Sequence, residues 1–286
     1  MAQIIDGKAL AATVRAEVAT EVQQIKAQGG VVRFAAVLVG EDPASQIYVR
    51  NKQRACEKVG IEFELHTLPA TCHFDELANL IRRLSADEKI NGVLLQLPVP
   101  PTVVGDRLTE LLNLIDPRKD VDGLTFTNLG RLADGADGLI PCTAQGILYA
   151  IHSVCPDLTG KNVVMIGRSR IVGRPTSLLL TNHHATVTVC HSRTRDLAAC
   201  TRGADIIVVA TGCAHLLKAS MVKPGAIVID VGINRLADGK LVGDVDFINV
   251  EKIATAITPV PGGIGPLTIA FLLKNIVVAY RRQHGC

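Results

Sequence analysis

The sequence is poor in several features that define common functional classes. Aromatic residues make up 3% of the 286 residues and tryptophan is absent, which argues against a nucleic-acid site built on base stacking. Lys and Arg number 30 against 27 Asp and Glu, so no clustered basic face for nucleic acid is expected. No run reaches the roughly 18 apolar residues that span a bilayer, and the start of the chain does not resemble a signal peptide. We therefore expect neither a nucleic acid nor a membrane as partner.

Metal-site and disulfide signals are also missing. Eight cysteines and eight histidines are present, but no pair has CxxC or HxxxH spacing. Several of the cysteines lie inside apolar runs, where cysteine behaves as a small hydrophobic residue. We interpret them as reduced thiols of a cytoplasmic protein and expect no bound metal.

What the sequence does contain is a regular alternation of apolar runs and helix-period segments. Runs that are apolar throughout are typical of parallel strands covered by helices on both faces, so we predict an α/β fold. The predicted strands are 34–39, 61–65, 92–97, 162–166, 186–190, 205–210 and 226–231, and the predicted helices are 8–28, 43–59, 75–86, 107–114, 143–151 and 172–181.

A polar, Gly-rich segment at 131–138 divides the chain. We predict a first domain over 1–140 and a second over 141–265, with a cleft between them. A last helix over 266–286 is expected to fold back onto the first domain.

The second domain has the pattern of a dinucleotide site. A predicted strand ends at Gly167, a turn containing Ser169 follows, and a helix begins near Gly173. This is the context of a Rossmann phosphate loop, in which backbone N–H groups at a helix N-terminus hold a pyrophosphate. Ser169 stands where the middle glycine of GxGxxG is usual, so a tight turn without a ligand is the alternative.

The tip of the next predicted strand favours NADP over NAD. NAD enzymes usually carry a carboxylate there for the ribose 2′-hydroxyl, whereas this chain has His191, Ser192 and Arg193, with Arg168 on the preceding turn. Arginine and hydroxyl groups bind a 2′-phosphate that a carboxylate would repel. The alternative is that these arginines are only solvated surface.

Polar residues of the first domain suggest a second site. Ser45, Tyr48 and Lys52 share one face of the predicted helix 43–59, and Gln96 lies within the predicted strand 92–97, which is otherwise apolar. The alternatives are a solvated lysine and an amide that satisfies backbone groups. Asp122 precedes a glycine turn that does not itself need two nearby aspartates.

These motifs together resemble the bifunctional methylenetetrahydrofolate dehydrogenase/methenyltetrahydrofolate cyclohydrolase family. The resemblance covers nearly the whole chain, and its motifs follow one another in order. They are Ser45-x-x-Tyr48-x-x-x-Lys52, Gln96-Leu-Pro-Val-Pro100, Lys119-Asp-Val-Asp122-Gly123, Gly167-Arg-Ser-x-Ile-Val-Gly173-Arg-Pro175, Gly243-Asp-Val245 and Pro259-Val-Pro-Gly-Gly-Ile-Gly-Pro266.

The resemblance implies a homodimer whose subunits each have an N-terminal folate-binding domain and a Rossmann-like NADP domain. It implies NADP-dependent oxidation of 5,10-methylenetetrahydrofolate to 5,10-methenyltetrahydrofolate, followed by hydrolysis to 10-formyltetrahydrofolate, in one-carbon metabolism. Lys52 would be the central cyclohydrolase residue beside Gln96, Asp122 would hold the pterin, and Tyr48 would pack beside the substrate.

The pattern and the resemblance together define the expected site residues. The expected catalytic residues are Lys52, Gln96, Asp122 and Tyr48. The expected substrate-binding residues are these four with Ser45, Leu97, Pro261, Gly262 and Gly263. The expected cofactor-binding residues are Gly167, Arg168, Ser169, Ile171, Val172, Gly173, Pro175, His191, Ser192, Arg193, Thr211, Gly212, Gly232, Ile233 and Thr268.

Three positions depart from the family pattern. Ala144 stands where proline is common, Cys213 where lysine is frequent, and Leu267 where methionine is common. Ala144 makes the entry to the following helix less rigid, and Cys213 removes a cation near the expected cofactor.

Three other functions fit parts of the pattern. One is a shikimate- or amino-acid-type NADP oxidoreductase with the same two-domain plan. Another is a hydrolase that has lost its dinucleotide site, and the third is a non-catalytic NADP-binding module. None of these requires Lys52, Gln96 and Asp122 to act together beside a cofactor.

Overall fold

A computed structural model describes residues 1–285 of the chain, which form two compact units. The six-stranded unit contains residues 1–12 and 143–268. The three-stranded unit contains residues 13–142 and 269–285. Helices α1 (Gly7–Ala27) and α11 (Ile264–His284) contribute residues to both units. The chain also crosses from the three-stranded unit to the six-stranded unit at the start of α7 (Cys142–His152).

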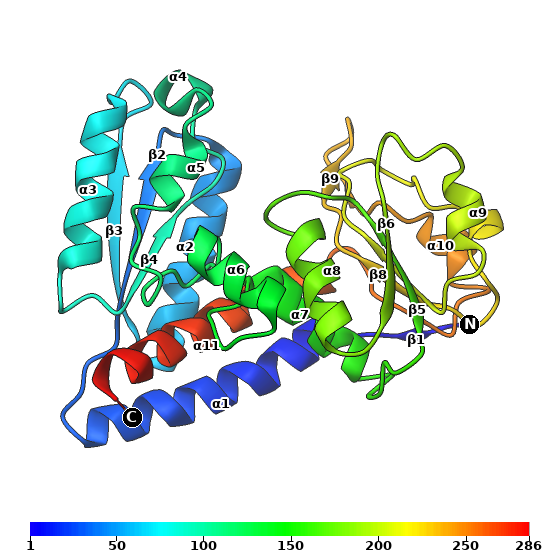
Figure 1. Cartoon of the computed structure of the whole chain (residues 1–286), viewed down its shortest axis with the longest axis horizontal. Coiled ribbons are helices and arrows are strands. Elements are labelled where there is room, and N and C mark those ends of the chain that lie inside the picture. The colour runs from blue at the N-terminus through cyan, green and yellow to red at the C-terminus, as the bar shows by residue number, and fades with distance from the viewer. Residues whose placement is uncertain (286) are drawn as a thin grey trace. The chain divides into compact units, whose positions relative to one another are not determined.

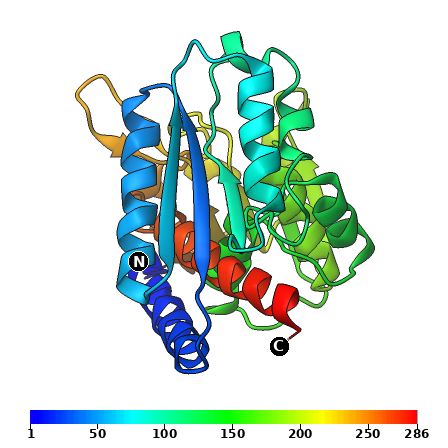
Figure 2. The same cartoon turned by 90° about the vertical axis from the view of Figure 1, so that its left-hand side faces the viewer.

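The three-stranded unit is built on the parallel sheet β3-β2-β4. Its strands are β2 (Arg33–Val39), β3 (Glu62–Leu68) and β4 (Gly92–Leu95), and Figure 2 shows them between α2 (Pro43–Val59) and α3 (Phe74–Ala86). All four residues of β4 and six of the seven residues of β2 are buried, as the apolar runs predict for a sheet covered on both faces. Three shorter helices follow: α4 (Pro101–Val104), α5 (Leu108–Leu112) and α6 (Phe126–Asp134).

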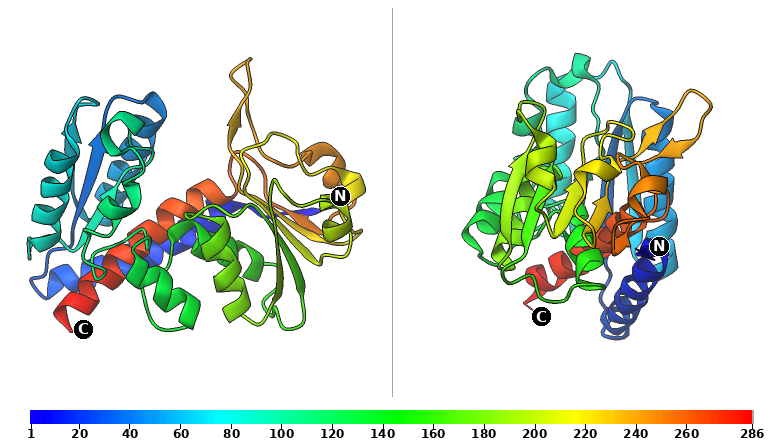
Figure 3. Two further views of the ribbon diagram at one scale, coloured as in Figure 1. Left: turned by 45° about the horizontal axis from the view of Figure 1, so that its top comes forward. Right: turned by 90° about the vertical axis from the view of Figure 1, so that its right-hand side faces the viewer.

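In the same unit α11 runs beside α1, as Figure 3 shows, and Arg281 Nη2 lies 3.1 Å from Glu21 Oε2. By length and composition alone α11 could span a membrane, although 61% of its most apolar window is buried inside the structure. Burial of this extent is typical of a core helix.

The six-stranded unit has an all-parallel sheet in the order β1-β11-β8-β7-β5-β6, part of which is labelled in Figure 1. Its strands are β1 (Gln3–Ile4), β5 (Asn162–Ile166), β6 (Thr186–Cys190), β7 (Ile206–Val209), β8 (Ile227–Asp230) and β11 (Ala256–Ile257). Around them lie α8 (Gly173–Asn182), α9 (Leu197–Thr201), α10 (Phe247–Val250), the short 3-10 helix η1 (Ala219–Met221) and the hairpin β9 (Asn234–Arg235) and β10 (Leu241–Val242).

The N-terminus differs from the sequence prediction. We expected a first domain that begins at residue 1, but β1 pairs with β11 at the edge of the six-stranded sheet. Ala2 N and Ile5 N donate to Glu251 O and Ile257 O on either side of that pair. Two-residue strands carry too little periodicity to be recognised in a sequence, so neither β1 nor β11 was predicted.

Most predicted elements are found within two residues of their expected ends, and α2, β5 and β6 have the expected bounds. Strand β4 ends at Leu95, two residues before its predicted end, and Gln96 N still donates to Val37 O of β2 over 2.8 Å. The seven cysteines in the described residues are all free thiols. Cys286, the eighth, lies outside the described residues.

Candidate active site

Lys52 and Gln96 meet in the three-stranded unit, where Lys52 Nζ donates to Gln96 Oε1 over 2.8 Å. Helix α2 carries Lys52, and its start is fixed by Pro43 in the first turn and by Asp42, whose side chain accepts the Ser45 N–H. Gln96 is 7% exposed and follows β4 directly. Its Nε2 donates to Leu97 O over 2.6 Å, so the amide presents its oxygen, rather than its nitrogen, to the lysine.

Burial shapes the electrostatics of Lys52 and Asp122. Both residues keep part of their surface exposed, but protein surrounds their charged groups. Burial lowers the pKa of Lys52, and the negative charge of Asp122 opposes that shift. Burial raises the pKa of Asp122, and the positive charge of Lys52 opposes it in turn. The two groups therefore stabilise each other's charge, so a change at either one shifts the other's protonation.

Two buried side chains fix the segment that carries Asp122 by binding the carbonyl of the preceding residue. Cys142 Sγ donates to Val121 O over 3.2 Å, and Asn275 Nδ2 donates to Val121 O and Ile140 O, both over 2.8 Å. Burial raises the pKa of Cys142 well above its ordinary value, so this thiol stays protonated and remains a donor.

Asp120 fixes the other side of the same segment. Its carboxylate accepts the N–H groups of Leu124 and Thr125 and the Nδ2 of Asn128. At 2% exposure it faces the interior. Asp120 is therefore taken up by donors of its own segment, whereas the charge of Asp122 acts on Lys52.

The other residues expected at the substrate divide between the two units. Tyr48 lies one turn before Lys52 on α2 and is 41% exposed. Ser45, 3% exposed, belongs to the cap that Asp42 makes on α2. Pro261, Gly262 and Gly263 belong to the six-stranded unit. The carbonyl of Gly263 packs so closely against Gly7 that a Cβ at Gly7 would overlap the Gly263 oxygen.

The expected phosphate loop follows β5 at the carboxyl edge of the six-stranded sheet. Gly167 has φ of +122° and lies against Ala210 O, while Gly173 lies against Gly167 O, and a Cβ at either position would overlap that backbone. Ser169 Oγ accepts the N–H groups of Val172 and Gly173 at the start of α8. This loop fits a dinucleotide phosphate, because its glycines let backbone pass close by and its helix start faces the loop.

The expected 2′-phosphate residues lie on exposed turns after β5 and β6. His191 O accepts the Thr194 N–H over 2.8 Å, and His191 Nδ1 accepts the Arg193 N–H over 3.1 Å. Ser192, Arg193 and Arg168 are all exposed. The first carboxylate after β6 is Asp196, and it accepts the Ala199 N–H as the cap of α9.

The remaining expected cofactor residues follow β7 and β8 or lie near the start of α11. Thr211 and Gly212 closely follow the end of β7 and are exposed, and Gly232 and Ile233 follow β8, with Ile233 50% exposed. Thr268 Oγ1 lies 3.3 Å from Thr143 Oγ1. The others, Ile171, Val172 and Pro175, belong to the turn and first residues of α8.

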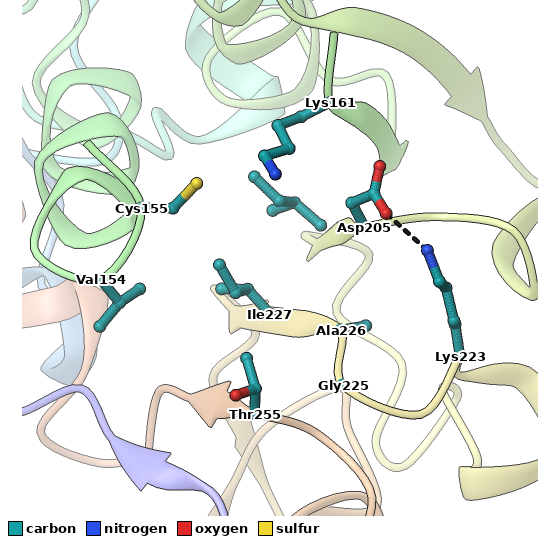
Figure 4. A pocket seen from close by; sticks show the side chains of 10 residues that line it. Val154, Cys155, Lys161, Asp205, Lys223, Gly225, Ala226, Ile227 and Thr255 are labelled. Atoms are coloured by element: carbon teal, nitrogen blue, oxygen red, sulfur yellow. Dashed lines mark hydrogen bonds and ion pairs between the residues drawn. The ribbon is translucent and has the colours of Figure 1, made fainter. Parts of the chain in front are cut away.

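A pocket in the six-stranded unit opens at the opposite, amino ends of β5, β7 and β8 (Figure 4). Lys161, Asp205 and Lys223 line it, and Lys223 Nζ lies 2.6 Å from Asp205 Oδ1. None of the expected site residues lines this pocket. No group of three His, Cys, Asp or Glu side chains suited to a metal occurs within residues 1–285.

Four buried residues that hydrogen-bond to segments carrying expected site residues were not themselves among the expected ones: Cys142, Asn275, Asp230 and Asp244. A signal existed for two of them. Asp244 is the centre of the motif Gly243-Asp-Val245, and Asn275 is a polar residue in the apolar part of the last helix. The three departures lie in the six-stranded unit: Ala144 and Leu267 are fully buried, and Cys213 is exposed.

The fold and these residues define an α/β enzyme that combines a Rossmann-type dinucleotide loop with a lysine–amide–carboxylate cluster. Two family models match the chain: the tetrahydrofolate dehydrogenase/cyclohydrolase catalytic domain over residues 5–122, and the NAD(P)-binding domain of the same name over residues 141–284. The chain therefore belongs to the tetrahydrofolate dehydrogenase/cyclohydrolase family.

Individual relatives agree over nearly the full length. The bifunctional protein FolD of Moorella thermoacetica is 53% identical over 281 residues, which cover 98% of this chain and 99% of that protein. The FolD crystal structure from Campylobacter jejuni is 46% identical with a TM-score of 0.95, covering 99% of this chain and 100% of that one. The Trypanosoma brucei enzyme, solved with NADP cofactor and an inhibitor, is 36% identical with a TM-score of 0.94, covering 100% and 99%.

Proposed function

We propose that this chain is a bifunctional methylenetetrahydrofolate dehydrogenase/methenyltetrahydrofolate cyclohydrolase of one-carbon metabolism, in which Asp122 orients the folate for both reactions and Lys52 with Gln96 serves the hydrolysis. Membership of the family supports the pair of activities over a shikimate-type oxidoreductase or a binding module. The observation that carries the residue assignment is the 2.8 Å hydrogen bond from Lys52 Nζ to Gln96 Oε1, next to the charge of Asp122.

The first reaction removes a hydride from the methylene carbon of 5,10-methylenetetrahydrofolate. When bound, the nicotinamide cofactor supplies the hydride acceptor, and the folate product is the methenyl cation. No proton is lost, so this reaction depends on orientation. Asp122 would orient the folate by accepting two N–H bonds from the amino-pyrimidine edge of the pterin, a charge-assisted pairing.

The second reaction adds water to the methenyl cation and opens the ring to 10-formyltetrahydrofolate, with release of one proton. This reaction needs a base, and burial lowers the pKa of Lys52 toward the range in which a neutral amine is available. Gln96 Oε1 accepts one N–H of Lys52. This bond fixes the orientation of the amine, so its lone pair and its other N–H point away from the amide. Lys52 would then accept a proton from the attacking water.

NADP is the nicotinamide cofactor that we propose. Gly167, Ser169 and Gly173 would hold the pyrophosphate, and Arg168, Ser192 and Arg193 the 2′-phosphate. The absence of a free carboxylate on the turn after β6 supports this choice, since Asp196 is used as a helix cap. The Trypanosoma brucei relative, which was crystallised in complex with NADP, also supports it.

The proposal includes two further points. We expect a homodimer with a tetrahydrofolate-type substrate and without a nucleic-acid or membrane partner, and light scattering would measure its mass. We also expect a cytoplasmic location, which the seven free cysteines support. Fractionation of cells that produce the protein would test it.

One assay tests the central proposal. Purified protein is mixed with methylenetetrahydrofolate and NADP, and the absorbances of the reduced cofactor and of the methenyl product are followed together. We expect reduced cofactor to accumulate while the methenyl signal rises and then falls. Oxidation of shikimate in place of the folate would contradict the proposal, and reduced cofactor with a stable methenyl signal would contradict the second activity.

A further inference from the structure

The six-stranded unit contains two buried carboxylates, Asp230 and Asp244, which are 2% and 0% exposed. Within residues 1–285, neither carboxylate forms an ion pair with a Lys, Arg or His side chain. A buried carboxylate is costly unless donors surround it. Their hydrogen bonds therefore indicate what these two residues support.

Asp244 joins the two loops that follow β7 and β8. Its Oδ2 accepts from Thr211 N over 2.6 Å, Thr211 Oγ1 over 2.9 Å and Gly212 N over 3.0 Å. Its Oδ1 accepts from Asn234 Nδ2 over 2.9 Å. Thr211 and Gly212 belong to one loop, and Asn234 directly follows Ile233 at the end of the other.

Asp230 binds the backbone on either side of Asp244 and holds that segment in place. Its Oδ1 accepts the N–H groups of Gly232 and Asp244, and its Oδ2 accepts that of Val245. The packing is so close that a Cβ at Gly232 would overlap the Asp244 carboxylate, and one at Gly243 would overlap that of Asp230. The two loops thus have little freedom to separate.

We propose that Asp244 is a positioning residue for the dinucleotide cofactor. It does not itself need to touch the cofactor. It holds the loop of Thr211 and Gly212 and the loop of Gly232 and Ile233 in one arrangement before the cofactor arrives. This inference rests on the proposed function, because it takes both loops as parts of the NADP site.

Asp244→Asn is the decisive variant, because an amide has one accepting oxygen where the carboxylate has two. The variant must give up either the bonds to Thr211 and Gly212 or the bond to Asn234. We expect the Kd for NADP, measured by calorimetry, to rise about tenfold, the equivalent of one lost charge-assisted hydrogen bond. Hydrolysis of methenyltetrahydrofolate, measured without cofactor, should stay at the wild-type rate.

Asp246→Asn is the matched control. It lies two residues further along, and its side chain accepts from Asn249 Nδ2 over 3.0 Å, on the helix that follows rather than on either loop. We expect its Kd for NADP to match that of the wild-type chain. Should Asp244→Asn fail to fold, Asn234→Ala removes one contact of Asp244 and should raise the same Kd about threefold.

The outcomes separate the inference from the function on which it rests. A wild-type chain that binds no NADP would overturn the proposed function and the positioning role together. Wild-type binding with an unchanged Kd in a folded Asp244→Asn variant would overturn the positioning role alone. A lower unfolding midpoint with an unchanged Kd would overturn it as well, by showing that Asp244 only stabilises the fold.

Discussion

The two units of the chain hold their functional side chains in different ways. In the three-stranded unit the residues contact one another, as Lys52 and Gln96 do, and burial shifts the pKa values of Lys52 and Asp122. In the six-stranded unit the expected ligand groups are mostly exposed, and buried carboxylates hold their loops from behind. The comparison leads us to expect that changes in the first arrangement affect reactivity, and that changes in the second affect cofactor affinity and specificity.

The largest expected effect breaks the reactive cluster. In Lys52→Met the amine is lost, and we expect the rate of methenyltetrahydrofolate hydrolysis to fall about a thousandfold, within the range typical of a lost general base. The Kd for NADP should not change, because the cofactor residues belong to the other unit. Absorbance of the methenyl group and calorimetry measure the two quantities.

Lys58→Met is the control for that variant. Lys58 is exposed and lies in the last turn of the same helix. Full cyclohydrolase activity in Lys52→Met would remove Lys52 from the mechanism.

The next effect tests whether both reactions use one folate orientation. In Asp122→Asn we expect kcat/KM of the dehydrogenase and of the cyclohydrolase to fall together by about a hundredfold, since one charge-assisted contact is lost. Asp116→Asn, which changes an aspartate of the same loop paired with Arg118, should affect neither. Loss of one activity alone would exclude a shared orientation.

A smaller effect sharpens the description of the six-stranded unit. Arg193→Ser removes a cation from the turn after β6, and we expect the ratio of kcat/KM for NADP over NAD to fall about thirtyfold. The exposed Arg202 on the same unit provides the control Arg202→Ser. A ratio that does not move would show that Arg193 is ordinary solvated surface.

The smallest effect concerns stability and pH. Burial raises the pKa of Asp230 to about 6 from an ordinary 3.8. A raised carboxyl pKa contributes stability that is complete below the unfolded-state pKa and is lost as pH rises through the folded-state pKa. As pH rises from about 5 to about 6.5, we expect the free energy of unfolding of the wild-type chain to fall by about 1 kcal/mol. The Asp230→Asn variant should not show this loss.

Urea titrations across that pH range measure the difference, and Asp205→Asn serves as the control. The hydrogen bond from Lys223 lowers the pKa of Asp205, so its contribution is present above about pH 4 and is lost only below that. A wild-type chain and an Asp230→Asn variant with parallel pH profiles would contradict the raised pKa.

Sequence reasoning recovered the elements with strong periodicity and the polar residues that stand out against them. Gln96 was recognisable as an amide in an apolar run. The two alternatives for it, a bond to backbone and a place beside Lys52, both occur, since its Nε2 donates to Leu97 O and its Oε1 accepts from Lys52 Nζ over 2.8 Å. The two-residue strands β1 and β11 were not recognisable, because their pairing depends on residues about 250 positions apart. Strand order and register across such distances are set by packing, which a single sequence does not display.

Asn275 and Asp244 stood out in the sequence, but the groups that they bind could not be predicted, for a related reason. Asn275 and Asp244 act through backbone groups of Val121, Ile140, Thr211 and Gly212. Backbone atoms are the same at every position, so the sequence carries no sign of which carbonyl or N–H a side chain will bind. The residues that face a ligand carry a chemical signature, whereas those that hold them in place often do not.

The pKa of Lys52 tests the central claim most directly, because it reports both the burial of the amine and its coupling to Asp122. A titration of its Nζ by heteronuclear NMR in the wild-type chain and in Asp122→Asn measures it. We predict a pKa below that of an ordinary lysine, lowered further when the charge of Asp122 is removed. An ordinary value in the wild-type chain, or the same value in both proteins, would contradict the account.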